Sequence, residues 1–147
     1  MRIVFTRPDG GTSVMTPAAQ ADVAKVLPEV ADMTPQQFVE FIRDRDVPAD
    51  ATNISIVPAS SIPADRHFRN ALKHDLTNDK AKCVEITKER LRAERAPLLA
   101  DLDTQYIRAQ EEGKPPAAIV AEKNRLRNIT NLPNASMTLE ELKAIKV

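Results

Sequence analysis

The placement of proline restricts the elements that this chain can form. The 147-residue sequence contains 11 prolines but only 3 glycines, so many backbone positions have a fixed φ and few adopt a positive φ without strain. Proline suits the first turn of a helix and disrupts the interior of one, so several of these prolines mark helix starts and ends. The scarcity of glycine also excludes glycine-rich phosphate-binding loops.

Residues 1–65 are expected to form a small α+β module. The β-prone runs at 2–6 and 12–16 flank Asp9-Gly10-Gly11, where glycine supplies the positive φ of a tight turn, so they predict a β-hairpin. The β-branched run at 54–57 predicts a third strand. A hairpin, then helices, then one strand favours an α+β fold with a three-stranded sheet.

Two helices are predicted inside this module. Thr16 can cap the first, Pro17 occupies its first position, and good helix formers follow through residue 27. The second is opened by Thr34 and Gln37, which are spaced as a capping box, and it ends near Asp46.

The second half of the chain is helical in composition. Residues 66–78 are predicted to be a connector, in which Phe68 and Leu72 contact a core, and residues 79–147 a helical hairpin with a short terminal helix. The long first helix is expected to end at Gly113, and an antiparallel helix to follow at 117–129.

Apolar residues recur at near-heptad spacing along the long helix, with an interruption at Arg95. Pro97 lies inside this helix, so we expect a kink or a short break near residues 94–97. The shorter antiparallel helix leaves part of the apolar stripe uncovered, which favours a protein that works by contact with partners. The candidate partner-binding residues are Val84, Leu91, Leu98, Leu102, Tyr106, Ile119 and Leu126.

Residue types that carry catalysis or bind metals are few. The soft metal ligands are His67, His74 and Cys83, and their spacing fits no structural zinc pattern. The serines follow no nucleophile-elbow motif, and no glycine-rich oxyanion loop is present. We therefore expect a non-enzymatic protein with no metal and no cofactor.

Charge is balanced along the chain. The sequence has 21 Lys+Arg, 21 Asp+Glu, a formal net charge of zero and 3% aromatic residues, which argues against wholesale binding of nucleic acid. The densest basic stretch is interleaved with glutamates at ion-pair spacings, so we expect a solvated or partner-facing surface there. Its cations are Lys88, Arg90, Arg92 and Arg95. Arg66 and Arg69 beside Asp65 form a smaller charged group, which is expected to anchor the connector rather than bind a ligand.

No apolar run approaches the roughly 20 residues of a membrane span. The first residues also lack the apolar core of a signal peptide, so we expect a protein made in the cytoplasm with no membrane partner.

Short motifs are spread along the chain, most densely from Asp46 onward. They are Arg2-Ile3-Val4-Phe5, Pro8-Asp9-Gly10-Gly11, Asp46-Val47-Pro48-Ala49, Ile56-Val57-Pro58-Ala59-Ser60, Ile62-Pro63-Ala64-Asp65-Arg66, Phe68-Arg69-Asn70-Ala71, Arg90-Leu91-Arg92, Arg95-Ala96-Pro97-Leu98-Leu99-Ala100, Leu102-Asp103, Tyr106, Lys123, Leu126-Arg127-Asn128-Ile129-Thr130 and Thr138-Leu139-Glu140-Glu141-Leu142-Lys143. In this order they resemble a group of small tailed-bacteriophage proteins encoded among tail or tail-fibre genes. Two departures are Leu72, where those proteins usually carry Trp, and the region 16–45, which is longer here.

The resemblance implies a virion or assembly role in the tail and no catalytic residue. The first hypothesis is a tail, tail-tip or tail-fibre-associated structural protein of the virion, made in the bacterial host cytoplasm, that contacts other tail or fibre proteins or further copies of itself. The alternatives are a tail-fibre assembly chaperone absent from the mature virion, and a small nucleic-acid-binding regulator that uses the basic stretch.

Overall fold

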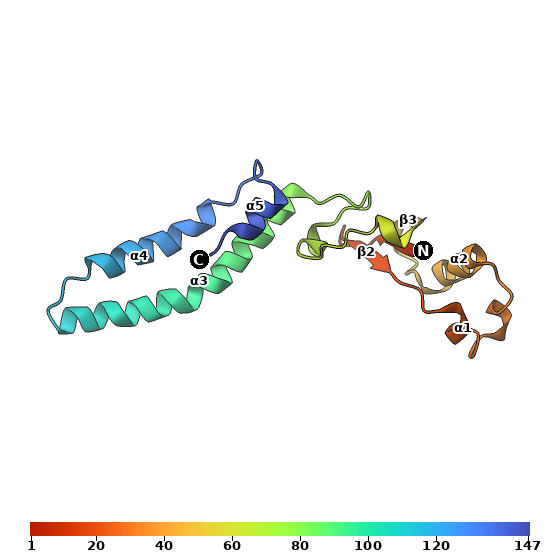
Figure 1. Cartoon of the computed structure of the whole chain (residues 1–147), viewed down its shortest axis with the longest axis horizontal. Helices are drawn as coiled ribbons and strands as arrows, with labels where there is room; N and C mark the ends of the chain where they lie inside the picture. Colours follow the sequence, from red (N-terminus) through yellow and green to blue (C-terminus); the bar gives the residue numbers. More distant parts are fainter. The chain divides into compact units, whose positions relative to one another are not determined.

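The computed structural model describes all residues from Met1 to Val147 and confirms an α+β fold (Figure 1). A three-stranded antiparallel sheet near the N-terminus is followed by helices, of which the longest lie in the C-terminal half. The chain divides into two compact units, Met1–Asp79 and Lys80–Val147. Residues 66–78, predicted to be a connector, group with the first unit.

The sheet of the first unit has the strand order β2-β1-β3. Strand β1 (Arg2–Thr6) pairs antiparallel with both β2 (Thr12–Met15) and β3 (Thr52–Val57), so the predicted hairpin and third strand are confirmed. The hairpin turn uses Gly10 at φ 77°, and the backbone N–H of Gly11 donates to the Asp9 carboxylate at 2.8 Å. Glycine at position 10 avoids the strain that a β-carbon introduces at positive φ.

The core of this unit lies between the sheet and helix α2 (Pro35–Asp46). The helix buries Phe38, Val39 and Ile42 in one cluster with Ile3 and Phe5 of β1.

The predicted start of α2 is confirmed. Thr34 accepts a hydrogen bond from the backbone N–H of Gln37, and the Gln37 side chain accepts one from the backbone N–H of Thr34 at 2.9 Å. Pro35 occupies the first turn, where its missing N–H removes no helical hydrogen bond.

The helix predicted from residue 18 to residue 27 is largely wrong. Helix α1 spans only Gln20–Val23, and its N-terminus lies after Ala19 with no side-chain cap, so Thr16 does not cap it. The Gln20 amide instead donates to the carbonyl oxygens of Val30 at 2.7 Å and Met33 at 2.8 Å. These bonds tie α1 to the 3-10 helix η1 (Pro28–Val30) and favour a compact turn over a longer helix.

Residues 58–79 complete the first unit with short turns, which include the 3-10 helices η2 (Ala59–Ser61) and η3 (Arg69–Ala71). Phe68 is 3% exposed, which confirms that it contacts a core, while Leu72 is half-buried and forms a β-bridge with Asn78. His74 Nε2 lies 3.4 Å from Ser55 Oγ of β3.

The second unit is built on helix α3 (Lys80–Glu111), with α4 (Ala117–Asn128), the 3-10 helix η4 (Ile129–Asn131) and α5 (Leu139–Ala144) packed against it or its neighbours (Figure 1). Helix α3 ends in a Schellman motif: Gly113 has φ 67°, its N–H donates to Gln110, and the N–H of Lys114 donates to Ala109 at 2.8 Å. The predicted helix end at Gly113 and the predicted short terminal helix are confirmed, and that helix, α5, begins with a capping box formed by Thr138 and Glu141.

Helix α3 continues without a break through Pro97. Its ribbon bends near the middle (Figure 1), so the predicted kink is present but the alternative of a break is not. Pro97 and Ala93 are exposed, so water can hydrogen-bond the Ala93 carbonyl that the proline leaves without a backbone donor.

Candidate functional site

The first half of α3 is covered by other parts of the second unit. Helix α3 packs against α4, η4 and α5. Val84 is 7% exposed, Leu91 0% and Leu126 1%, so these three candidate partner-binding residues have almost no surface that a partner could contact.

Two arginines of α3 bind the C-terminal ends of the shorter helices. Arg95 Nη1 donates to the carbonyl oxygens of Leu126 at 3.1 Å and Arg127 at 2.6 Å. Arg90 Nη2 donates to the carbonyl oxygen of Ile145 at 2.8 Å. The last carbonyls of a helix lack intrahelical donors and carry partial negative charge, so a guanidinium there satisfies them and stabilises the helix end.

This arrangement accounts for most of the basic stretch. Arg90 and Arg95 serve the fold, Lys88 lies 3.0 Å from Glu85 in an ion pair, and Arg92 is exposed. One exposed arginine is a poor phosphate-binding surface, because sequence-independent nucleic-acid binding needs several cations together. The position that interrupts the apolar stripe, Arg95, is therefore a structural cap.

The second half of α3 lies beside α4, whereas α5 lies beside the first half (Figure 1). We name residues 97–125, which include the loop between these helices, the distal hairpin. Lys123 of α4 joins the two helices, because its ammonium lies 2.5 Å from the Asp103 carboxylate and 5.1 Å from the centre of the Tyr106 ring. Two helices without a third layer cannot enclose their apolar side chains on all sides.

The remaining candidate partner-binding residues lie in the distal hairpin and keep exposed surface. Leu98 is 44% exposed, and Leu102, Tyr106 and Ile119 are half-buried.

Further exposed apolar residues were not among the candidates. Ile107 is 56% exposed and Val120 39%, both in the distal hairpin, and Leu132 beyond α4 is 54% exposed. Ile107 lies nine positions after Leu98, which places the two on opposite sides of α3. Near-heptad spacing selects only one side of a helix, so it could not identify Ile107.

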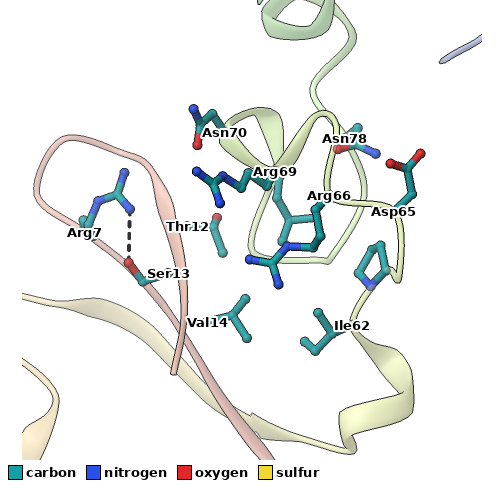
Figure 2. A pocket seen from close by; sticks show the side chains of 12 residues that line it. Arg7, Thr12, Ser13, Val14, Ile62, Asp65, Arg66, Arg69, Asn70 and Asn78 are labelled. Carbon is teal, nitrogen blue, oxygen red and sulfur yellow. Dashed lines mark hydrogen bonds between the residues drawn. The ribbon is translucent and has the colours of Figure 1, made fainter. Parts of the chain in front are cut away.

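A pocket with a volume of about 280 Å³ lies in the first unit, between the β1–β2 hairpin and the segment 62–78 (Figure 2). Its lining residues are Arg7, Thr12, Ser13, Val14, Ile62, Pro63, Asp65, Arg66, Arg69, Asn70, Leu72 and Asn78. The Asp65 carboxylate accepts a hydrogen bond from the backbone N–H of His67 at 2.9 Å. No hydrogen bond or ion pair of the structure engages the guanidinium of Arg66 or Arg69, so their anchoring of the segment stays a prediction, whereas Phe68 between them is 3% exposed.

The residue types considered for catalysis or metal binding lie apart. No three His, Cys, Asp or Glu side chains are grouped so that they could hold a metal ion. Cys83 is fully buried in α3, and His74 contacts the hydroxyl of Ser55, which the sequence did not single out. No helix is both long enough and apolar enough to cross a lipid bilayer.

No protein-family model, curated protein or solved structure matches this chain.

Proposed function

We propose that this protein is a non-enzymatic structural component of a bacteriophage virion, associated with the tail, tail tip or tail fibre. It acts through protein–protein contacts made by the distal hairpin. The observation that carries the contact role is the exposed apolar surface of that hairpin, where Leu98 is 44% and Ile107 56% exposed. The assignment to a phage tail is supported by the sequence resemblance alone.

The distal hairpin has the properties of a surface completed by another chain. Two helices bury little apolar area, and residues between Pro97 and Gly113 include only one buried side chain, Ala109 at 9%. Covering Leu98, Ile107 and Val120 would remove apolar area from water, and the transfer free energy favours this burial by about 25 cal/mol for each Å². Because Leu98 and Ile107 lie on opposite sides of α3, covering both takes two partner surfaces, supplied by other tail proteins or by further copies of this hairpin.

The first half of α3, with the ends of α4 and α5 bound to it, forms the base from which the distal hairpin extends. Arg90 and Arg95 bind α5 and α4 to α3 through backbone carbonyls, and Leu91 and Leu126 are enclosed. The helical unit therefore combines an enclosed part around Leu91 and Leu126 with an incompletely covered distal hairpin.

The second candidate is a tail-fibre assembly chaperone, which would use the same exposed surface and then leave. The nucleic-acid-binding regulator is disfavoured, because the side chains of Arg90, Arg95 and Lys88 are engaged within the chain.

Quantitative mass spectrometry of virions tests the proposal. Particles purified from a phage that encodes this chain should contain it at a constant ratio to the major tail protein after a high-salt wash. Its presence in infected cells and absence from washed particles would favour the chaperone and contradict the structural role. Whole-cell lysate is the matched control, since it shows that the protein is made and detectable.

A further inference from the structure

The pocket of the first unit brings Arg7 together with Arg66 and Arg69, which lie about 60 positions later in the sequence. Arg7 comes from the end of the first hairpin strand, whereas Arg66 and Arg69 come from the turns after β3. Figure 2 shows the side chains of Arg66 and Arg69 projecting from their segment toward the hairpin.

Two of these arginines have unused hydrogen-bonding capacity. Arg7 is engaged, because its Nε lies 3.2 Å from the Asp9 carboxylate and its Nη1 donates to Ser13 Oγ at 3.1 Å. The guanidinium groups of Arg66 and Arg69 have no such partner within the chain. Like charges at one pocket repel one another, and an anion bound between them removes that cost.

Acidic groups at the pocket do not offset all three arginines. Asp9 is bound to Arg7, and the Asp65 carboxylate is turned to the side of the pocket away from Arg69 in Figure 2. The pocket therefore has an excess of positive charge directed at its interior.

The other lining residues fit a phosphate with a carbon skeleton attached. A guanidinium presents a planar pair of donors that matches two phosphate oxygens, and hydroxyl and amide groups can donate to the third. Thr12, Asn70 and Asn78 supply such groups. Val14 and Ile62 form an apolar wall on which carbon atoms can pack.

We propose that this pocket binds the phosphate group of a small phosphate monoester, with Arg66 and Arg69 as its main ligands. A monoester carries a charge of about −1.5 to −2 at neutral pH, which matches two unpaired guanidinium groups better than a single carboxylate does. The volume of about 280 Å³ lies near the lower end of ligand pockets and suits a molecule no larger than a mononucleotide.

Calorimetric titration of the full chain at low salt tests this site. Adenosine monophosphate and inorganic phosphate are the probes, and adenosine is the uncharged control. Adenosine monophosphate and phosphate should bind, whereas adenosine should not. Each of the substitutions Arg66→Gln and Arg69→Gln should weaken binding by about tenfold or more, because each removes a charge-assisted hydrogen-bonding group.

Arg92→Gln is the matched variant, since it removes one exposed arginine in the other unit. Its affinity for adenosine monophosphate should equal that of the parent. Arg66 and Arg69 are exposed, so circular dichroism should show an unchanged fold in both pocket variants.

Three results would overturn the assignment. They are the absence of binding by both charged probes, equal affinity in the parent and the Arg66→Gln/Arg69→Gln double variant, and an equal loss in Arg92→Gln. A short single-stranded oligonucleotide that binds more tightly than adenosine monophosphate would assign the pocket to nucleic acid and overturn the small-molecule proposal.

Discussion

Arg95 of α3 donates from Nη1 to the carbonyl oxygen of Arg127 at 2.6 Å, at the C-terminal end of α4. The same nitrogen lies 3.1 Å from the Leu126 carbonyl and 3.3 Å from Thr130 Oγ1. One side chain thus supplies hydrogen bonds to the last carbonyl oxygens of α4 and fixes where α4 leaves α3. Arg90 does the same for α5, so two arginines define the packing of the helical unit.

Arg95→Met should destabilise the helical unit by about 2 kcal/mol, because hydrogen bonds from a charged donor are lost and helix-end carbonyls remain partly buried. Urea denaturation followed by circular dichroism measures this free energy of unfolding. The control Arg92→Met removes an exposed arginine and should stay within about 0.5 kcal/mol of the parent. Equal destabilisation by both substitutions would contradict the capping role of Arg95.

Gly113→Ala should destabilise the same unit by about 1 kcal/mol, because a β-carbon is strained at the positive φ of 67°. No atom lies within 4 Å of the position that this carbon would occupy, so the loss comes from backbone strain and not from a clash. Gly113→Asn should lose less, since asparagine tolerates this conformation better. A larger loss for asparagine than for alanine would show that the motif at the end of α3 has another conformation in solution.

Glu141 makes the stability of α5 depend on pH. The backbone N–H of Thr138 donates to its carboxylate at 2.6 Å, and this bond, together with the Thr138 hydroxyl and nearby Lys80, lowers the pKa of Glu141 below its ordinary value of 4.5. Because the pKa is lower in the folded state, the stabilisation is complete above pH 4.5 and is lost as the pH falls through the folded-state pKa.

Glu141→Gln keeps an oxygen acceptor in the capping box but does not titrate. The parent should therefore melt at a higher temperature than the variant at pH 7, and the gap should shrink at pH 3. Thermal denaturation at the two pH values measures this gap. Glu111→Gln, outside the capping box, is the control. A gap of the same size at both pH values would contradict the link between Glu141 ionisation and folding.

Leu98→Asp should leave folding nearly unchanged but prevent incorporation into particles. The side chain is 44% exposed, so the charge remains hydrated in the free protein and loses water only when a partner covers it. The measurements are the melting temperature and the amount of variant in purified virions. Val26→Asp alters an apolar residue that is 80% exposed in the other unit, and its incorporation should be normal.

Local signals predicted much of the secondary structure. The Thr34–Gln37 and Thr138–Glu141 capping boxes act within four residues, and Gly113 ends α3 because its own backbone adopts a positive φ. Such signals need no knowledge of the rest of the fold. Gln20 shows where they fail, since its partners Val30 and Met33 become available only when the chain turns back.

The candidate surfaces were harder to predict than the secondary structure, because they form through contacts between residues far apart in the sequence. Arg95 was only an interruption in an apolar stripe, because its acceptors lie more than 30 positions away and are brought to it by the hairpin. Spacing along α3 placed Leu91 and Leu98 on one stripe but could not tell which of them other elements cover. Likewise, Arg66 and Arg69 join Arg7 in a pocket only through tertiary folding.

Site-specific photo-crosslinking tests the central claim, that the distal hairpin is a contact surface in the virion. A photoreactive phenylalanine derivative at position 98 should produce a covalent adduct with another polypeptide in purified particles, identifiable by mass spectrometry. The same group at position 26 should produce none. Particles that contain the labelled protein but yield no adduct from position 98, or that yield equal adducts from both positions, would contradict the account.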